Sequence, residues 1–362
     1  MTDQQRARDI GIPFGGRPGS LNAITDVAGL EVGHVTLIEG EGLRVVGTGP
    51  IRTGVTAILP RGRTHDPCFA GWYALNGNGE MTGTTWIEES GFLETPIVLT
   101  NTHSVGVVRD AVIAWMVEHN QVGEAASDLF GLPVVAETYD GDLNDINGFH
   151  VRQKHVFEAL DAAAPGCVAE GSVGGGTGMI THDFKAGIGT ASRVVESAGQ
   201  AVTIGVLVQS NYGAFEDLVI AGIPMADAIP GPSGYRRGGD GSIIVVIATD
   251  APLLPHQLKR LARRAPMGIA RTGGVGADSS GDIFLALSTA NPGVWSAAAP
   301  QADFLPNADM TNLFRGVIEA TEEAILNALV AAESMTGCDG RRVDALPKPA
   351  VRDALSRHGR LT

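Results

Sequence analysis

The chain has 362 residues, 44% of them hydrophobic, which is enough to fill one large core or two smaller ones. Its formal net charge of −14 at pH 7 argues against nucleic-acid binding, which needs clustered Lys and Arg, and suits small-molecule ligands, including cationic ones. Cys68, Cys167 and Cys338 form no CxxC pair, so we expect three reduced, mostly buried thiols and neither a disulfide framework nor a structural zinc site.

The first nine residues are polar and lack the apolar segment of a secretory signal. No stretch of 18 apolar residues is free of charged residues or glycine breaks, so the sequence predicts no membrane span. We therefore expect a cytoplasmic protein.

Apolar, β-branched runs predict strands at residues 30–38, 53–59, 96–100, 133–137, 201–208, 243–249 and 282–289. Helical spacing predicts helices at residues 106–119, 151–160, 214–228, 255–264 and 311–334, and in the last of these Glu319, Glu322 and Glu323 are expected to face water. The mixture of strands and helices predicts an α/β or layered α+β fold without a visible domain boundary. The glycine-rich stretch 231–239 is the best candidate for an exposed loop.

The most informative segment is the junction at residues 239–249, where Gly241 and Ser242 precede an unbroken apolar run typical of a buried strand. A hydroxyl at the start of a core strand, directly after glycine, suits a chain that cuts itself at Gly241–Ser242 and then uses Ser242 as an N-terminal nucleophile. The local pattern also fits an ordinary turn that leads into a strand.

Several other motifs are absent or incomplete. No serine lies in a G-x-S-x-G frame, and neither HExxH nor a P-loop is present. The glycine cluster at residues 174–178 lacks the P-loop lysine, so it predicts close backbone approach rather than phosphate binding. The pairs His65–Asp66 and His182–Asp183 have no further ligand spacing and are interpreted as surface or capping groups.

Polar residues follow or precede other predicted strands, where sites in layered folds often form. Ser280 and Asp282 stand at the start of the strand at 282–289 and would lie near Ser242 if the two strands are neighbours. Glu137, Tyr139 and Asn211 lie at or just beyond the ends of the strands at 133–137 and 201–208. An ordinary polar turn would give the same local pattern.

Taken together, six segments resemble the DmpA-type aminopeptidase family, which includes the β-peptidyl aminopeptidases. The resemblance extends from about Gly15 to about Leu346 and is carried by residues 53–60, 100–106, 136–141, 174–179, 240–244 and 280–284. It implies an αββα sandwich that is similar to the N-terminal-nucleophile hydrolases but has distinct strand connectivity. It further implies one catalytic domain, residues 1–362, cut into chains 1–241 and 242–362 that stay together.

The resemblance also implies roles for individual residues. Gly241–Ser242 is the bond that is cut, and Ser242 becomes the nucleophile. Ser280 and Asp282 are implied as its supporting hydroxyl and carboxylate, and some relatives carry Glu at the position of Asp282. The remaining roles concern the substrate: Glu137 is implied to bind its free amine, and Asn211 and Tyr139 to stabilise the oxyanion.

The expected activity is hydrolysis of N-terminal residues from peptides, amino-acid amides or esters through an acyl-enzyme on Ser242, without a metal or other cofactor. The freed α-amine titrates near neutral pH and could serve as the general base. The substrate needs a free N-terminus, and the family resemblance implies a homo-oligomer, a tetramer of cleaved heterodimers. An acyltransferase of the ornithine acetyltransferase type, or a non-catalytic binding protein, would share the scaffold, but the former normally uses threonine as the nucleophile. Trp86 is a candidate for the side-chain pocket.

Overall fold

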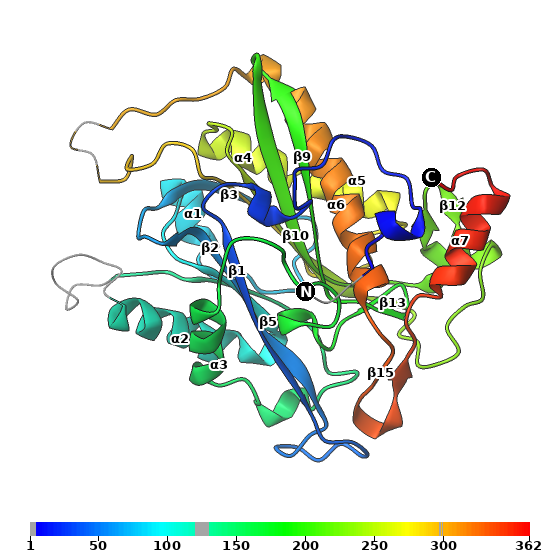
Figure 1. Cartoon of the computed structure of the whole chain (residues 1–362). Helices are drawn as coiled ribbons and strands as arrows, with labels where there is room; N and C mark the ends of the chain where they lie inside the picture. Colours follow the sequence, from blue (N-terminus) through cyan, green and yellow to red (C-terminus); the bar gives the residue numbers. More distant parts are fainter. Residues whose placement is uncertain (1–4, 120–129, 297, 299) are drawn as a thin grey trace.

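The computed structural model describes residues 5–119, 130–296, 298 and 300–362, and it shows two β-sheets enclosed by two layers of helices (Figure 1). The smaller sheet has the order β1-β2-β5-β6, formed by Glu31–Glu39, Ile51–Arg63, Ile97–Asn101 and Val134–Thr138. The larger sheet has the order β4-β3-β14-β13-β10-β9, formed by Phe92–Leu93, Cys68–Ala74, Asp282–Ser288, Gly239–Thr249, Gln200–Gly213 and Ile188–Ser197.

Helices cover the outer face of each sheet. On the smaller sheet, α2 (Val105–Glu118) and α3 (Gln153–Asp161) pack against the outward residues of β2, β5 and β6. On the larger sheet, α4 (Pro255–Ala262), α5 (Ala265–Arg271) and α6 (Thr311–Ala331) form the other outer layer. Helix α1 (Thr84–Ser90) contacts β3, and α7 (Lys348–Arg357) packs beside the end of α6. The αββα fold expected from the sequence is confirmed.

Short two-stranded ribbons complete the fold. They are β7 (Ile180–Thr181) with β8 (Phe184–Lys185), β11 (Val219–Ile220) with β12 (Ile223–Pro224), and β15 (Met335–Thr336) with β16 (Arg342–Val343).

Strand β13 explains why its sequence is an unbroken apolar run. Ile243, Val245 and Ile247 face the helices, while Ile244 and Val246 face the smaller sheet. Because both faces of the strand are buried, its sequence does not alternate between apolar and polar residues. The strand is therefore held in one register, since a shift by one residue would exchange its two faces.

All the strands predicted from the sequence are present, but β10 continues to Gly213 and so contains Asn211, and β13 begins at Gly239 and so contains Ser242. The helices predicted at 106–119, 151–160, 255–264 and 311–334 correspond to α2, α3, α4 and α6. The helix predicted at 214–228 is wrong: that segment forms β11, β12 and flanking 3₁₀ turns. Ala221 and Gly222 both have positive φ in the turn between the two strands, and Pro224 cannot donate a helical hydrogen bond.

The expectation that three glutamates of α6 face water is wrong for Glu323, which is completely buried, and the side chains of Glu319 and Glu322 are only 13% and 18% exposed. Its carboxylate accepts hydrogen bonds from Arg8, Asn22 and Arg193, and Arg193 is itself buried. Two arginines on separate segments thus compensate one buried carboxylate, a long-range arrangement that helical periodicity does not reveal.

Within the described part of the chain, no helix is long and apolar enough to cross a membrane. The three cysteines are free thiols, and Cys68 and Cys338 are buried whereas Cys167 is exposed.

Candidate active site

The junction singled out in the sequence lies at the start of β13. Gly241 has φ 137°, a conformation that residues with a side chain rarely adopt. A methyl group at this position would lie 1.9 Å from the carbonyl oxygen of Asn211. Position 241 therefore requires glycine for two independent reasons, its backbone angle and its contact with β10.

Ser242 occupies the first buried position of β13 and is only 8% exposed. It pairs with Asn211 on the antiparallel neighbour β10, and the next residue, Ile243, pairs with Asp282 on the parallel neighbour β14. The Ser242 hydroxyl oxygen accepts a hydrogen bond from the backbone N–H of Gly281 at 3.0 Å. The two polar turns that precede β13 and β14 therefore meet at one edge of the sheet.

Ser280 and Asp282 form a buried pair beside this edge. The Ser280 hydroxyl donates to the Asp282 carboxylate at 2.6 Å, and Asn76 donates to its other oxygen at 3.3 Å. Burial raises the pKa of the Asp282 carboxyl, while the bonds from Ser280, from the N–H of Ile243 and from Asn76 lower it. The carboxylate thus lies against the backbone one residue beyond Ser242.

Asn211 is fully buried on β10, and both ends of its side-chain amide are hydrogen-bonded. Its Oδ1 accepts from the backbone N–H of Ile180 at 2.9 Å and from Arg237 at 2.8 Å. Its Nδ2 donates to the carbonyl oxygen of Tyr139 at 2.9 Å, which leaves the second Nδ2 hydrogen for another acceptor. The Tyr139 side chain itself is 44% exposed.

Glu137 lies near the end of β6 and is 3% exposed. Its carboxylate accepts hydrogen bonds from the Thr102 hydroxyl and, at 2.9 Å, from the backbone N–H of Glu80. Burial raises the pKa of the Glu137 carboxyl above its ordinary value, and these two hydrogen bonds oppose that shift. The site therefore holds a carboxylate that is poorly solvated but still hydrogen-bonded.

A cavity of about 680 Å³ opens beside Ser242, and Asn211, Ser280 and Asp282 are not among the residues that line it. Ser242, Gly241, Glu137 and Tyr139 all line it. Its other charged lining residues are Glu80, Asp142, Asp240 and Arg237. Since carboxylates outnumber the single guanidinium, the cavity suits a ligand with a positive charge.

Sequence reasoning missed several members of this site. Thr102 lies within a quoted segment but gave no signal of its contact with Glu137, which comes from a neighbouring strand. Arg237 looked like part of a turn, yet its side chain is only 10% exposed and is paired with Asp142 at 2.8 Å. The N–H of Gly281 could not be identified as a donor to Ser242 before the pairing of β13 with β14 was known.

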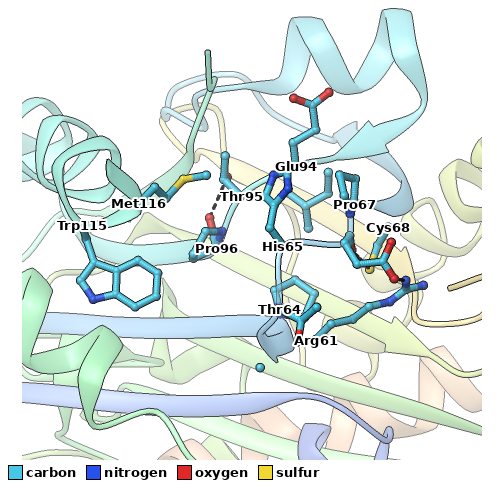
Figure 2. A pocket seen from close by; sticks show the side chains of 14 residues that line it. Arg61, Thr64, His65, Pro67, Cys68, Glu94, Thr95, Pro96, Trp115 and Met116 are labelled. Carbon is cyan, nitrogen blue, oxygen red and sulfur yellow. Dashed lines mark hydrogen bonds and ion pairs between the residues drawn. The ribbon is translucent and has the colours of Figure 1, made fainter. Parts of the chain in front are cut away.

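Other residues considered in the sequence lie elsewhere. The indole N–H of Trp86, on α1, donates to Glu94 at 2.5 Å, so this side chain is held in a local contact. His65 and Asp66 line a separate small pocket of about 30 Å³, shown in Figure 2. Asp66 pairs with Arg61 and accepts the backbone N–H of Gly293, which confirms its capping role.

The pair His182–Asp183 is fully buried, so its interpretation as a surface group is wrong, whereas capping is confirmed for Asp183. The Asp183 carboxylate accepts the backbone N–H groups of Phe215, Arg237 and Gly238. It therefore anchors the loop that leads into the junction. The sequence could not reveal this burial, because the loop that covers the pair lies some 50 residues further along the chain.

The glycine cluster at 174–178 permits close packing, as expected from the sequence. A methyl group on Gly175 would lie 2.2 Å from Oε1 of Gln209, and one on Gly176 would lie 2.4 Å from the backbone nitrogen of Ile188. Over the residues that the structure describes, no group of three or more His, Cys, Asp or Glu side chains is arranged to hold a metal ion.

Comparisons with known proteins show which family this chain belongs to and which solved structures share its fold. Residues 22–343 match Peptidase family S58. The chain is 52% identical to a β-peptidyl aminopeptidase, BapA, of Sphingosinicella microcystinivorans, over 98% of this chain and 93% of the relative. The fold also matches a Burkholderia β-aminopeptidase structure, with a TM-score of 0.88 and 50% identity over 98% of this chain and 99% of the other.

A further structural match is the L-aminopeptidase D-Ala-esterase/amidase of Ochrobactrum anthropi, described as a prototype of the serine aminopeptidases and a variant of the N-terminal-nucleophile hydrolase fold. Its TM-score is 0.91, with 48% identity over 99% of both chains. The layered fold and the family match thus define a hydrolase with a fold of this kind. The chain belongs to peptidase family S58 and is an aminopeptidase; the acyltransferase alternative is not favoured.

Proposed function

We propose that this aminopeptidase matures by cutting its own Gly241–Ser242 bond and then removes N-terminal residues through an acyl-enzyme on Ser242. The observation that carries the proposal is that Ser242 and Glu137 line the same cavity. A nucleophile and a buried carboxylate in one cavity suit an acyl substrate with a free ammonium group.

In the first step, the Ser242 hydroxyl oxygen attacks the carbonyl carbon of Gly241. A bond forms between Oγ and that carbon, the bond to the Ser242 nitrogen breaks, and the hydroxyl proton ends on this nitrogen. Water then opens the ester, which leaves a carboxylate on Gly241 and a free hydroxyl and α-amine on Ser242. Glycine favours the attack because no side chain shields the carbonyl carbon.

In the mature enzyme, the freed α-amine of Ser242 would act as general base for the same hydroxyl. The Asp282 carboxylate supports this role, since it already accepts the N–H of the adjacent residue, Ile243. Ser280 holds Asp282 in place through their 2.6 Å hydrogen bond. We propose that Asn211 and Tyr139 stabilise the oxyanion that forms when Ser242 attacks the substrate. For Asn211 the proposal rests on its second Nδ2 hydrogen, and for Tyr139 on its position in the cavity wall.

The substrate class follows from the cavity and from the relatives. Glu137 would bind the substrate ammonium in a charge-assisted hydrogen bond and so restrict hydrolysis to free N-termini. Relatives named as β-peptidyl aminopeptidases and as an L-aminopeptidase D-Ala-esterase/amidase support peptides, amino-acid amides and esters as substrates.

We also propose that the cleaved protein is a homo-oligomer, a tetramer of heterodimers as the family resemblance implies. The hairpin between β1 and β2 projects from the body of the molecule (Figure 1). Its tip exposes three apolar side chains, with Leu43, Val45 and Val46 exposed by 78%, 55% and 64%. Exposed apolar side chains that lie together are typical of protein–protein contacts.

Purified wild-type protein should show two bands on a denaturing gel, corresponding to residues 1–241 and 242–362. Ser242→Ala should show one intact band and no aminopeptidase activity, because the attacking hydroxyl is gone. Ser233→Ala, in the loop upstream of the junction, should cleave like wild type. An intact wild-type chain that still hydrolyses aminoacyl p-nitroanilides would show that maturation by cleavage is wrong.

Glu137→Gln should raise KM for an aminoacyl p-nitroanilide about tenfold or more, since a hydrogen bond to a charged group contributes about 1.5–3 kcal/mol. In wild type, KM should rise as pH falls through the raised pKa of Glu137, because the protonated carboxyl no longer attracts the ammonium. Glu137→Asp should keep this pH dependence and Glu137→Gln should lose it. Equal hydrolysis of free and N-acetylated substrates by wild type would contradict the assignment.

The double substitution Leu43→Asp/Val46→Asp should lower the mass measured by light scattering, because it places charges in the proposed contact. Val117→Asp, at an exposed apolar position on α2, serves as the control and should keep the wild-type mass. A wild-type mass equal to that of a single cleaved heterodimer would rule out the proposed oligomer.

A further inference from the structure

Arg237 connects the proposed oxyanion residue to the segment that is cut. Its guanidinium donates to Oδ1 of Asn211 at 2.8 Å and to the backbone carbonyl of Asn211 at 3.0 Å. It also donates to the carbonyl oxygen of Asp240 at 3.2 Å, one residue before the proposed cleavage bond. One side chain thus contacts both the proposed oxyanion residue and the backbone just before the proposed cleavage bond.

The contact with Asn211 determines which way its amide group points. Arg237 and the N–H of Ile180 both donate to the same atom, so that atom must be the oxygen. The amide nitrogen then points to the carbonyl of Tyr139, and its second hydrogen remains available. A cation on the oxygen also polarises the amide, which strengthens its N–H groups as donors.

The contact with Asp240 holds the backbone just before the junction. At this place the pairing of β10 with β13 shifts register between Asn211 and Gly213, so regular pairing is interrupted at Asp240 and Gly241 and resumes where Gly213 faces Gly239. A methyl group on Gly241 would lie 2.6 Å from a guanidinium nitrogen of Arg237, which shows how closely the side chain follows this segment. Arg237 therefore supplies a side-chain contact to the backbone at this interruption, one peptide unit before the carbonyl that Ser242 would attack.

Arg237 is itself held from two other directions. Its Nε donates to Asp142 at 2.8 Å, and its backbone N–H donates to Asp183 at 2.7 Å. Asp142 is fixed in turn by the Tyr235 hydroxyl at 2.9 Å. The three guanidinium nitrogens contact Asp142, Asn211 and Asp240 at once, whereas a lysine ammonium offers only one nitrogen.

We propose that Arg237 is a positioning residue for both reactions at Ser242: it presents the junction for cleavage and afterwards keeps Asn211 oriented toward the acyl carbonyl. This inference rests on the proposed function. The contacts with Asp142 and Asp183 do not involve the bond that is cut, so we expect the guanidinium to stay beside Asn211 in the mature site.

The test measures each reaction separately in Arg237→Ala and Arg237→Lys. Cleavage is followed in pulse-labelled chains made by cell-free translation, and turnover is normalised to the cleaved fraction given by intact mass. Both variants should cleave more slowly and lose about 10- to 100-fold in kcat, with KM within about threefold of wild type, because a misplaced oxyanion donor affects the transition state. Added guanidinium ion should restore part of both rates in Arg237→Ala only.

Arg236→Ala is the matched control, since Arg236 binds Asp183 and Glu216 on the same loop. It should cleave and turn over within about threefold of wild type. The shared role would be overturned by normal rates in both Arg237 variants or by a fall in only one of the two rates. It would equally be overturned by a fall of the same size in Arg236→Ala, or by the absence of any response of Arg237→Ala to guanidinium. If wild type itself is not cleaved, the proposed maturation fails instead, so the two failures are distinguishable.

Discussion

The parallel pairing of β13 with β14 is the constraint on which the site depends. It places Ile243 opposite Asp282 and so brings the turn before each strand to the same edge of the sheet. Both strands are buried on both faces, between the smaller sheet and the helices, so neither can slip without placing its side chains on the wrong face. Ser242 and the N–H of Gly281 are 3.0 Å apart as a direct result.

The electrostatics of the site follow from burial. Glu137 and Asp282 are both removed from water, which raises their pKa values, and hydrogen-bond donors from neighbouring elements oppose that shift. Arg237 and Asp142 neutralise each other at one side of the cavity. The hydrogen-bond donors of Glu137 within the described part of the chain are Thr102 and the N–H of Glu80, neither of them cationic, so its carboxylate is left to attract a group with the positive charge of a free N-terminus.

The sequence was sufficient for the layered fold and for the principal strands, because their apolar runs are long and bounded by turns. It failed at 214–228, where Ala221 and Gly222 form a turn inside a segment whose apolar spacing resembled a helix. It also failed at Glu323, whose burial depends on Arg8 and Arg193 from distant segments.

The candidate site shows the same limit. Ser242, Glu137 and Asp282 were recognisable because each stands at or near the end of an apolar run and within a family motif. Thr102, Arg237 and Asp142 were not, since their contacts arise only when separate strands and loops are brought together. Backbone donors such as the N–H of Gly281 cannot be recognised from the type of residue, because nearly every residue carries one.

The central claim is that Ser242 is the nucleophile, and trapping the acyl-enzyme tests it most directly. Wild-type protein would be mixed with an excess of a slowly hydrolysed amino-acid ester, quenched in acid and mapped by peptide mass spectrometry. The account predicts one acyl group on the peptide that begins with Ser242. An acyl group on Ser280 or on another residue, or turnover of the ester with no covalent adduct, would contradict it.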